Sequence, residues 1–102
     1  MSDINEVRKA LVMRILEGTG KTSPAERSAA FTNNGLAEPV NVLVDKVALH
    51  ANRVNDGDIS AAIGSGLSED QVFEIVVCAA IGQASRQYQA ALAALNVASG
   101  RN

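Results

Sequence analysis

The feature that most constrains this fold is a long segment near the C-terminus whose apolar side chains are not confined to one face. Nearly every residue from 72 to 81 is apolar, and residues 87–99 include no charged side chain. A helix that is apolar all round must be covered all round. The segment therefore predicts a helix buried by the rest of the chain or by a second copy of it.

This segment is also long for a chain of 102 residues. Ser68 as N-cap and Gln71 three residues later predict the helix start, and the helical pattern continues to about Asn96. At about 1.5 Å per residue such a helix spans some 42 Å, whereas a compact domain of this size has a radius of gyration near 13 Å. Either the helix bends at Gly82, or its far end packs on another subunit. We predict a homo-oligomer with this helix in the interface.

The rest of the chain is predicted to be helical as well. Hydrophobic residues make up 47 % of the sequence and aromatic residues only 3 %, and no stretch alternates between apolar and polar residues as a strand would. The prediction is one all-α domain over residues 1–102, a compact bundle of about five helices with a long C-terminal helix. The first four helices are expected at residues 3–17, ending at Gly18-Thr19-Gly20; 23–33, starting with a Ser23/Glu26 capping box; 38–53, starting at Glu38-Pro39; and 55–64, capped by Asn55.

Composition excludes several classes of protein. The net charge is −2 and the basic residues are scattered, so no nucleic-acid partner is expected. The apolar runs are too short to cross a bilayer and the N-terminus lacks a signal-peptide pattern, so we expect a cytoplasmic protein with no membrane partner. A single cysteine, Cys78, and a single histidine, His50, exclude an internal disulfide and a local metal cluster. No metal or other cofactor is expected.

Glu74 is the first candidate for chemistry. It is the one acidic residue within residues 72–81, and it shares a helical seam with Gln71, Cys78 and Ser85. A carboxyl group among apolar neighbours would have a raised pKa and could serve as a general base. In the alternative reading, the seam is the wetter edge of the helix, and Glu74 is solvated or paired with an arginine.

Cys78 and His50 are weaker candidates. Cys78 lies one helical turn after Glu74, where negative charge disfavours the thiolate, so a buried and unreactive thiol is the simpler interpretation, with a ligand contact as the alternative. His50 lies at the edge of the apolar stripe of the third predicted helix. It could take part in acid/base chemistry, or it could be a core-edge histidine with one hydrogen bond.

Three more charged residues complete the candidate set. Arg53 and Arg86 could hold an anionic ligand or form ion pairs between helices with acidic residues such as Asp58. The sequence leaves this choice open.

The turn Gly66-Leu67-Ser68-Glu69 and the Ala-rich helix after it resemble the alkylhydroperoxidase D-like, or carboxymuconolactone decarboxylase, superfamily. In that group a short helix leads into a Gly-Leu-Ser-Asp/Glu turn and then a long helix of small residues. Residues 37–96 follow this order, and residues 1–36 fit it loosely. The resemblance implies an all-α fold and assembly into closed oligomers such as trimers or hexamers.

The chain departs from the family's redox motif. Redox members carry Cys-x-x-Cys followed by His at the start of the short helix, where this chain has Val54-Asn55-Asp56-Gly57-Asp58. Without a thiol pair, disulfide-linked peroxide reduction is not possible. The position of the family's His is roughly that of Asp58, which makes Asp58 a candidate acid/base group.

Two hypotheses follow. In the first, the chain binds a small molecule or performs cysteine-independent acid/base chemistry of the decarboxylase or lactone type, with Glu74, His50 and Asp58 as catalytic groups and Arg53, Arg86 and Cys78 as binding groups. In the second, it is a non-catalytic oligomeric assembly or accessory module. An enzyme should gather Glu74, His50 and an arginine around one cavity, whereas a module should hold them apart or pair them within the packing.

Overall fold

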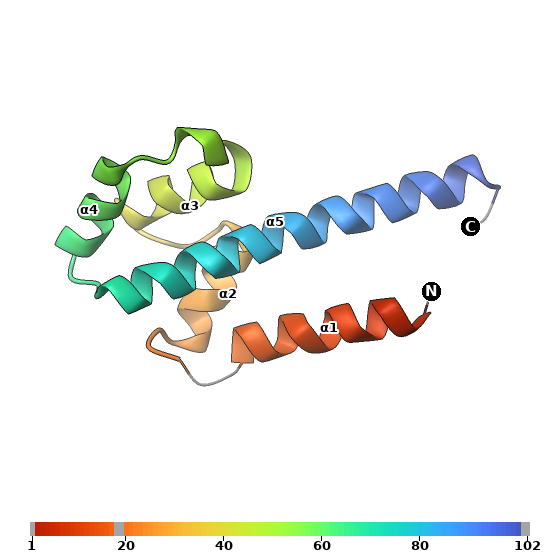
Figure 1. Ribbon diagram of the computed structural model, residues 1–102, viewed down its shortest axis with the longest axis horizontal. Helices are drawn as coiled ribbons and strands as arrows, with labels where there is room; N and C mark the ends of the chain where they lie inside the picture. Colours follow the sequence, from red (N-terminus) through yellow and green to blue (C-terminus); the bar gives the residue numbers. More distant parts are fainter. Residues whose placement is uncertain (1, 18–19, 101–102) are drawn as a thin grey trace.

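The computed structural model describes residues 2–17 and 20–100, and every regular element in these ranges is helical (Figure 1). The all-α prediction is confirmed, and so is the long C-terminal helix. The elements in chain order are α1 (Ser2–Glu17), α2 (Pro24–Thr32), α3 (Val40–Leu49), the short 3₁₀ helix η1 (Ala51–Arg53), α4 (Asp56–Gly64) and α5 (Glu69–Ala98). The predicted stop of the first helix at Gly18-Thr19 lies outside the described residues.

Three of these helices begin at the caps that the sequence predicts. The side chains of Ser23, Asn55 and Ser68 each accept a hydrogen bond from the backbone N–H three residues later, and the residue at that position bonds back to the cap. Such reciprocal bonds satisfy N–H groups that have no partner within the helix. The starts of α2, α4 and α5 are therefore fixed by local chemistry.

The predicted end of the third helix at Arg53 is wrong, because α3 ends at Leu49. His50 leaves the helical conformation (φ −146°, ψ 55°), and one turn of 3₁₀ helix follows. This turn redirects the chain so that Val54 and Ile59 pack against the cluster formed by Leu43, Ala62 and Val72. The apolar periodicity of the sequence continues past residue 49. However, Val54 and Ile59 can be buried only if the chain turns after α3 and a second helix, α4, begins.

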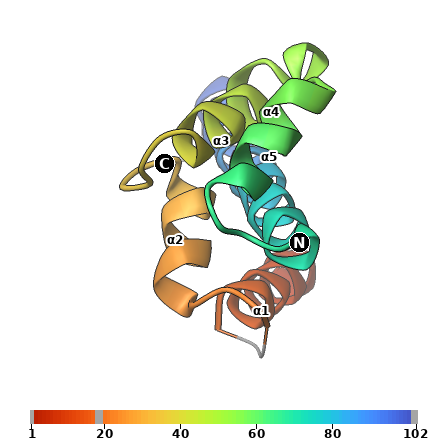
Figure 2. The same cartoon turned by 90° about the vertical axis from the view of Figure 1, so that its left-hand side faces the viewer.

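The first half of α5 is the centre of the bundle. Figure 2, which looks nearly along α5, shows α1, α2, α3 and α4 arranged around it. Its buried side chains include Ile75 and Ala79, which pack with Ala30 of α2 and Val44 of α3. Phe73, however, is 68 % exposed, so one side of this apolar stretch is not covered within a single subunit.

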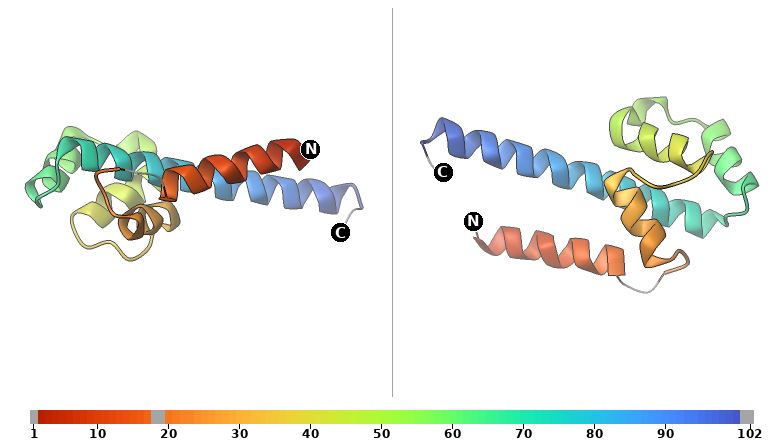
Figure 3. Two further views of the ribbon diagram at one scale, coloured as in Figure 1. Left: turned by 90° about the horizontal axis from the view of Figure 1, so that it is seen from below. Right: turned by 180° about the vertical axis from the view of Figure 1, so that it is seen from behind.

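Gly82 is a crossing point rather than a bend. α5 runs through it without a break, and it looks straight in every view (Figures 1 and 3). The backbone of Phe31, near the end of α2, lies so close that a Cβ on Gly82 would collide with the Phe31 carbonyl group. Of the two predicted alternatives, the bend at Gly82 is therefore wrong, and the small residue serves close helix packing.

The molecule extends well beyond its bundle. Its principal extents are 50 × 29 × 19 Å and its Cα radius of gyration is 15.3 Å, against about 13 Å for a compact chain of this length. The excess comes from two arms, α1 and residues 87–98 of α5, which project in the same direction (Figure 3, right). Large exposed apolar side chains on the arms are Val7, Leu11, Met13, Leu95 and Val97. In the described part of the chain, no helix has the length and apolar character needed to span a membrane.

Candidate functional site

The six candidate residues do not converge on one cavity. Glu74 and Cys78 line a cavity between α1, α2 and α5, hereafter the α1–α5 cavity. His50 and Arg53 line a different one between the α2–α3 connection and α3, hereafter the α2–α3 cavity. Asp58 and Arg86 are hydrogen-bonded elsewhere. The arrangement expected of an acid/base enzyme, Glu74 with His50 and an arginine, is therefore not formed within this subunit.

Glu74 is held by the turn that precedes α2. The backbone N–H of Lys21 donates to both carboxylate oxygens, at 2.9 and 2.8 Å, and Thr22 donates its backbone N–H and its hydroxyl to Oε1. Hydrogen bonds to the charged form, first from Lys21 and then from Thr22, lower the pKa of Glu74 in spite of some burial. The raised pKa of the general-base reading is therefore wrong, and the partners are Lys21 and Thr22 rather than the arginine or solvent of the alternative reading, because the sequence does not reveal that these donors lie beside α5. Glu74 is a structural carboxylate.

Cys78 is a buried thiol, with 1 % of its surface exposed. Desolvation raises its pKa, nearby Glu74 adds to this effect, and the positive charge of Arg27 opposes it. A thiol in this environment stays protonated at neutral pH and is a poor nucleophile. The interpretation of Cys78 as a small buried side chain fits these observations.

Asp58 joins α4 to α3. Its carboxylate accepts hydrogen bonds from Lys46 Nζ at 2.9 and 3.0 Å and from the backbone N–H of Asn55 at 3.0 Å. The Lys46 hydrogen bond is the main cause of its lowered pKa. A carboxylate with a lowered pKa is a weaker base, so the ion pair and the capping box oppose a role for Asp58 in proton transfer.

Arg86 stabilises the crossing of α2 and α5. Its Nη1 donates to the Phe31 carbonyl oxygen at 2.6 Å, and its Nη2 donates to Gln83 Oε1 at 3.1 Å. The Phe31 carbonyl lies in the last turn of α2, where carbonyl groups lack partners within the helix. Arg86 therefore caps α2 instead of holding an anion.

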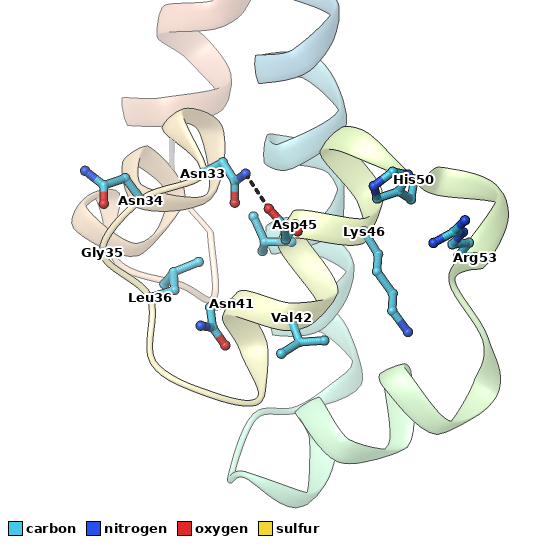
Figure 4. A pocket seen from close by; sticks show the side chains of 11 residues that line it. Asn33, Asn34, Gly35, Leu36, Asn41, Val42, Asp45, Lys46, His50 and Arg53 are labelled. Atoms are coloured by element: carbon cyan, nitrogen blue, oxygen red, sulfur yellow. Dashed lines mark hydrogen bonds between the residues drawn. The ribbon is translucent and has the colours of Figure 1, made fainter.

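The α2–α3 cavity is the larger of the two, with a volume of about 540 Å³ (Figure 4). His50 and Arg53 lie on one side of it, and Asn33 donates to Asp45 Oδ1 across it at 3.1 Å. The Oδ1 atom of Asn41 is buried and has no hydrogen-bond partner. The residues that line the α2–α3 cavity are Asn33, Asn34, Gly35, Leu36, Asn41, Val42, Val44, Asp45, Lys46, His50 and Arg53.

The α1–α5 cavity is smaller, about 220 Å³, and contains a residue that sequence reasoning missed. Arg27 of α2 is 5 % exposed, donates from Nη1 to the Ile15 carbonyl oxygen at 2.9 Å, and has a buried Nε without a partner. The sequence offers one signal for this burial: Arg27 precedes Ala30 by about one helical turn, and Ala30 packs against α5. The lining residues are Arg14, Ile15, Gly20, Arg27, Phe73, Glu74, Val77 and Cys78.

Neither cavity offers a metal site. Within residues 2–17 and 20–100, no group of three or more His, Cys, Asp or Glu side chains is arranged to hold an ion. Comparison of this chain with protein-family models, with curated proteins and with solved structures found no match in any of the three.

Proposed function

We propose that this chain is a subunit of a homo-oligomeric, non-catalytic helical protein of the alkylhydroperoxidase D-like type, which assembles through its two arms. The observation that carries the proposal is the exposure of large apolar side chains on both arms: Val7 is 69 %, Leu95 59 % and Val97 74 % exposed. Apolar surface concentrated in this way marks an interaction site.

A second copy of the same chain is the occupant that the arms suit best. Val7 and Leu11 lie one helical turn apart on α1, and Leu92 and Leu95 lie three residues apart on α5, so each arm presents an apolar stripe. Residues 87–99 carry no charge that would have to be neutralised in an interface. In a two-fold arrangement the stripes of one subunit can cover those of the other reciprocally.

The non-catalytic part of the proposal rests on the state of the acidic candidates and the thiol. The Glu74 carboxylate accepts four hydrogen bonds, Asp58 is paired with Lys46, and Cys78 is buried. Each group has a structural partner or environment that opposes proton transfer or nucleophilic attack. The lack of a second cysteine in the sequence also rules out a dithiol cycle.

Sedimentation and light scattering between about 1 and 100 µM test the assembly, because association depends on protomer concentration. The wild-type protein should be a dimer or larger, and Leu95→Lys should dissociate it. Leu49→Lys is the matched control, since Leu49 is 56 % exposed but lies on α3, away from the arms. A monomeric wild type throughout this range, or equal effects of both substitutions, would contradict the proposal.

A second candidate function is binding of a small hydroxy acid in the α2–α3 cavity. A hydroxyl group would supply the donor that Asn41 Oδ1 lacks, and Arg53 and His50 offer donors to a carboxylate. Because His50 is the only histidine, its imidazole signals in an NMR spectrum report directly on this cavity. Lactate should shift these signals saturably in the wild type and not in Arg53→Gln, whereas unchanged signals in the wild type would exclude this candidate.

A further inference from the structure

A buried arginine beside the α1–α5 cavity is not accounted for by the packing. Arg27 is 5 % exposed, yet its Nε has no acceptor. Burying a charged group is costly unless it is paired and hydrogen-bonded, and the great majority of buried polar atoms have a partner. The guanidinium is therefore left with an unmet requirement for an acceptor.

Glu74 does not meet this requirement directly. In the described part of the chain, no acidic side chain lies within 4.0 Å of the Arg27 guanidinium to form an ion pair. The carboxylate of Glu74 instead accepts its hydrogen bonds from Lys21 and Thr22. Arg27 acts on Glu74 only through space, as a coulombic influence. The guanidinium remains available to a second anionic group.

The cavity next to Arg27 has the size and lining of an amphiphilic site. Its volume of about 220 Å³ corresponds to about seven water-sized groups. Ile15, Val77 and the largely exposed Phe73 supply the apolar part of its lining. Two guanidinium groups, from Arg14 and Arg27, against the single carboxylate of Glu74 leave the lining with a net positive charge.

We infer that the α1–α5 cavity binds a small organic monocarboxylate with a short alkyl chain. The carboxylate accepts from the Arg27 guanidinium, and the alkyl chain lies against Ile15, Phe73 and Val77. Charge-assisted hydrogen bonds of this kind are the stronger ones, and a few polar groups in an apolar cavity are the usual arrangement of a small-molecule site. The lining comes from one subunit, so this inference is independent of the proposed assembly.

An NMR titration with sodium hexanoate tests the inference. Hexanoate should shift the backbone amides of residues 15, 27, 73 and 77 saturably, with a dissociation constant of about 1 mM for a ligand of this size. Hexan-1-ol has the same chain without the charge, and acetate has the charge without the chain. Both should bind at least about tenfold more weakly, because each lacks one half of the recognition.

Four variants make the test specific. Arg27→Gln removes the guanidinium and Val77→Phe fills the cavity, and each should weaken hexanoate binding at least about tenfold. Leu49→Lys, at an exposed residue of α3 that lines neither cavity, should bind as the wild type does. Leu95→Lys should also bind normally, which separates this inference from the proposed assembly.

Several results would overturn the inference. These are an absence of saturable shifts in the wild type, equal binding of hexanoate and hexan-1-ol, and undiminished binding in folded Arg27→Gln. The comparison of the three ligands uses only the wild-type protein, so the inference remains testable even if Arg27→Gln fails to fold.

Discussion

Thr22 donates both its backbone N–H, at 3.0 Å, and its hydroxyl, at 2.9 Å, to the same carboxylate oxygen of Glu74. The two residues are 52 positions apart, and this contact fastens the segment before α2 to the first half of α5. Gly20 lies beside the same carboxylate, and a Cβ there would lie 2.7 Å from Glu74 Oε1, so a larger residue would require the Glu74 side chain to shift. Glu74, the acidic residue that looks most catalytic in the sequence, thus forms a tertiary contact that stabilises the fold.

The first prediction concerns the charge of Glu74. Glu74→Gln replaces one carboxylate oxygen with an NH₂ group, which cannot accept a hydrogen bond, and removes the negative charge, so we expect a loss of about 1–2 kcal/mol in the free energy of unfolding. Urea unfolding followed by circular dichroism measures it. Glu38→Gln, at an exposed acidic residue in the α2–α3 connection, is the matched control and should change stability by less than about 0.5 kcal/mol. Equal stability of the two variants would show that the hydrogen bonds of Glu74 with Lys21 and Thr22 contribute little to the free energy of unfolding.

The second prediction is the pH dependence of the same contact. The pKa of Glu74 is lower in the folded protein than its ordinary value of 4.5, so its contribution is fully present above that value and is lost as the pH falls through the folded-state pKa. The difference in urea midpoint between wild type and Glu74→Gln should therefore narrow as the pH is lowered from about 6 to about 3. Asp58 also has a lowered pKa, but both proteins contain Asp58, so its effect on stability cancels in the difference. If the difference in urea midpoint stays constant over this pH range, the lowered pKa of Glu74 in the folded protein is contradicted.

The third prediction concerns the accessibility of Cys78. Its burial and raised pKa should make labelling by a thiol-reactive disulfide reagent at least about 100-fold slower in the native protein than in denaturant, because reaction requires local opening. The protein has one cysteine, so the kinetics have a single origin. Rapid labelling under native conditions would place the thiol in contact with solvent.

The fourth prediction tests the crossing of α2 and α5. Gly82→Ala adds a methyl group where the Phe31 carbonyl group already lies, so we expect a net loss of about 3 kcal/mol despite the better helix propensity of alanine. Gly64→Ala is the control, since a Cβ there meets nothing within 4 Å, and it should leave stability unchanged or raise it slightly. Thermal unfolding of both variants and the wild type measures these effects. If Gly82→Ala is as stable as the wild type, α2 and α5 can move apart at little cost in free energy.

Local chemistry explains which parts of the fold could be predicted. The capping boxes at Ser23, Asn55 and Ser68 involve residues three positions apart, so sequence spacing is sufficient to find them. The end of α3 at Leu49 could not be found in this way, because no glycine or proline marks it. That boundary depends on the burial of Val54 and Ile59 against Leu43 of α3, Ala62 of α4 and Val72 of α5.

The candidate residues were harder to interpret because their partners are distant in sequence. Arg86 reaches the carbonyl of Phe31, 55 positions away, and Asp58 pairs with Lys46, 12 positions away. The sequence singled out Glu74 by its place in an apolar helix, Asp58 by the family resemblance and Arg86 as a possible partner of an anion, but only the tertiary arrangement shows what each one binds. Arg27 was missed because a single arginine in a short helix resembles an ordinary surface residue until its burial is known.

The unbroken course of α5 through Gly82 also fixes the angular phase of the distal arm. Each residue in an α-helix turns the chain by about 100°, so insertion or deletion of one residue between Gly82 and Leu92 would rotate the arm's apolar stripe by roughly a quarter-turn relative to the bundle. The number of residues in this stretch, and not only their identity, sets the direction in which the arm presents Leu92 and Leu95.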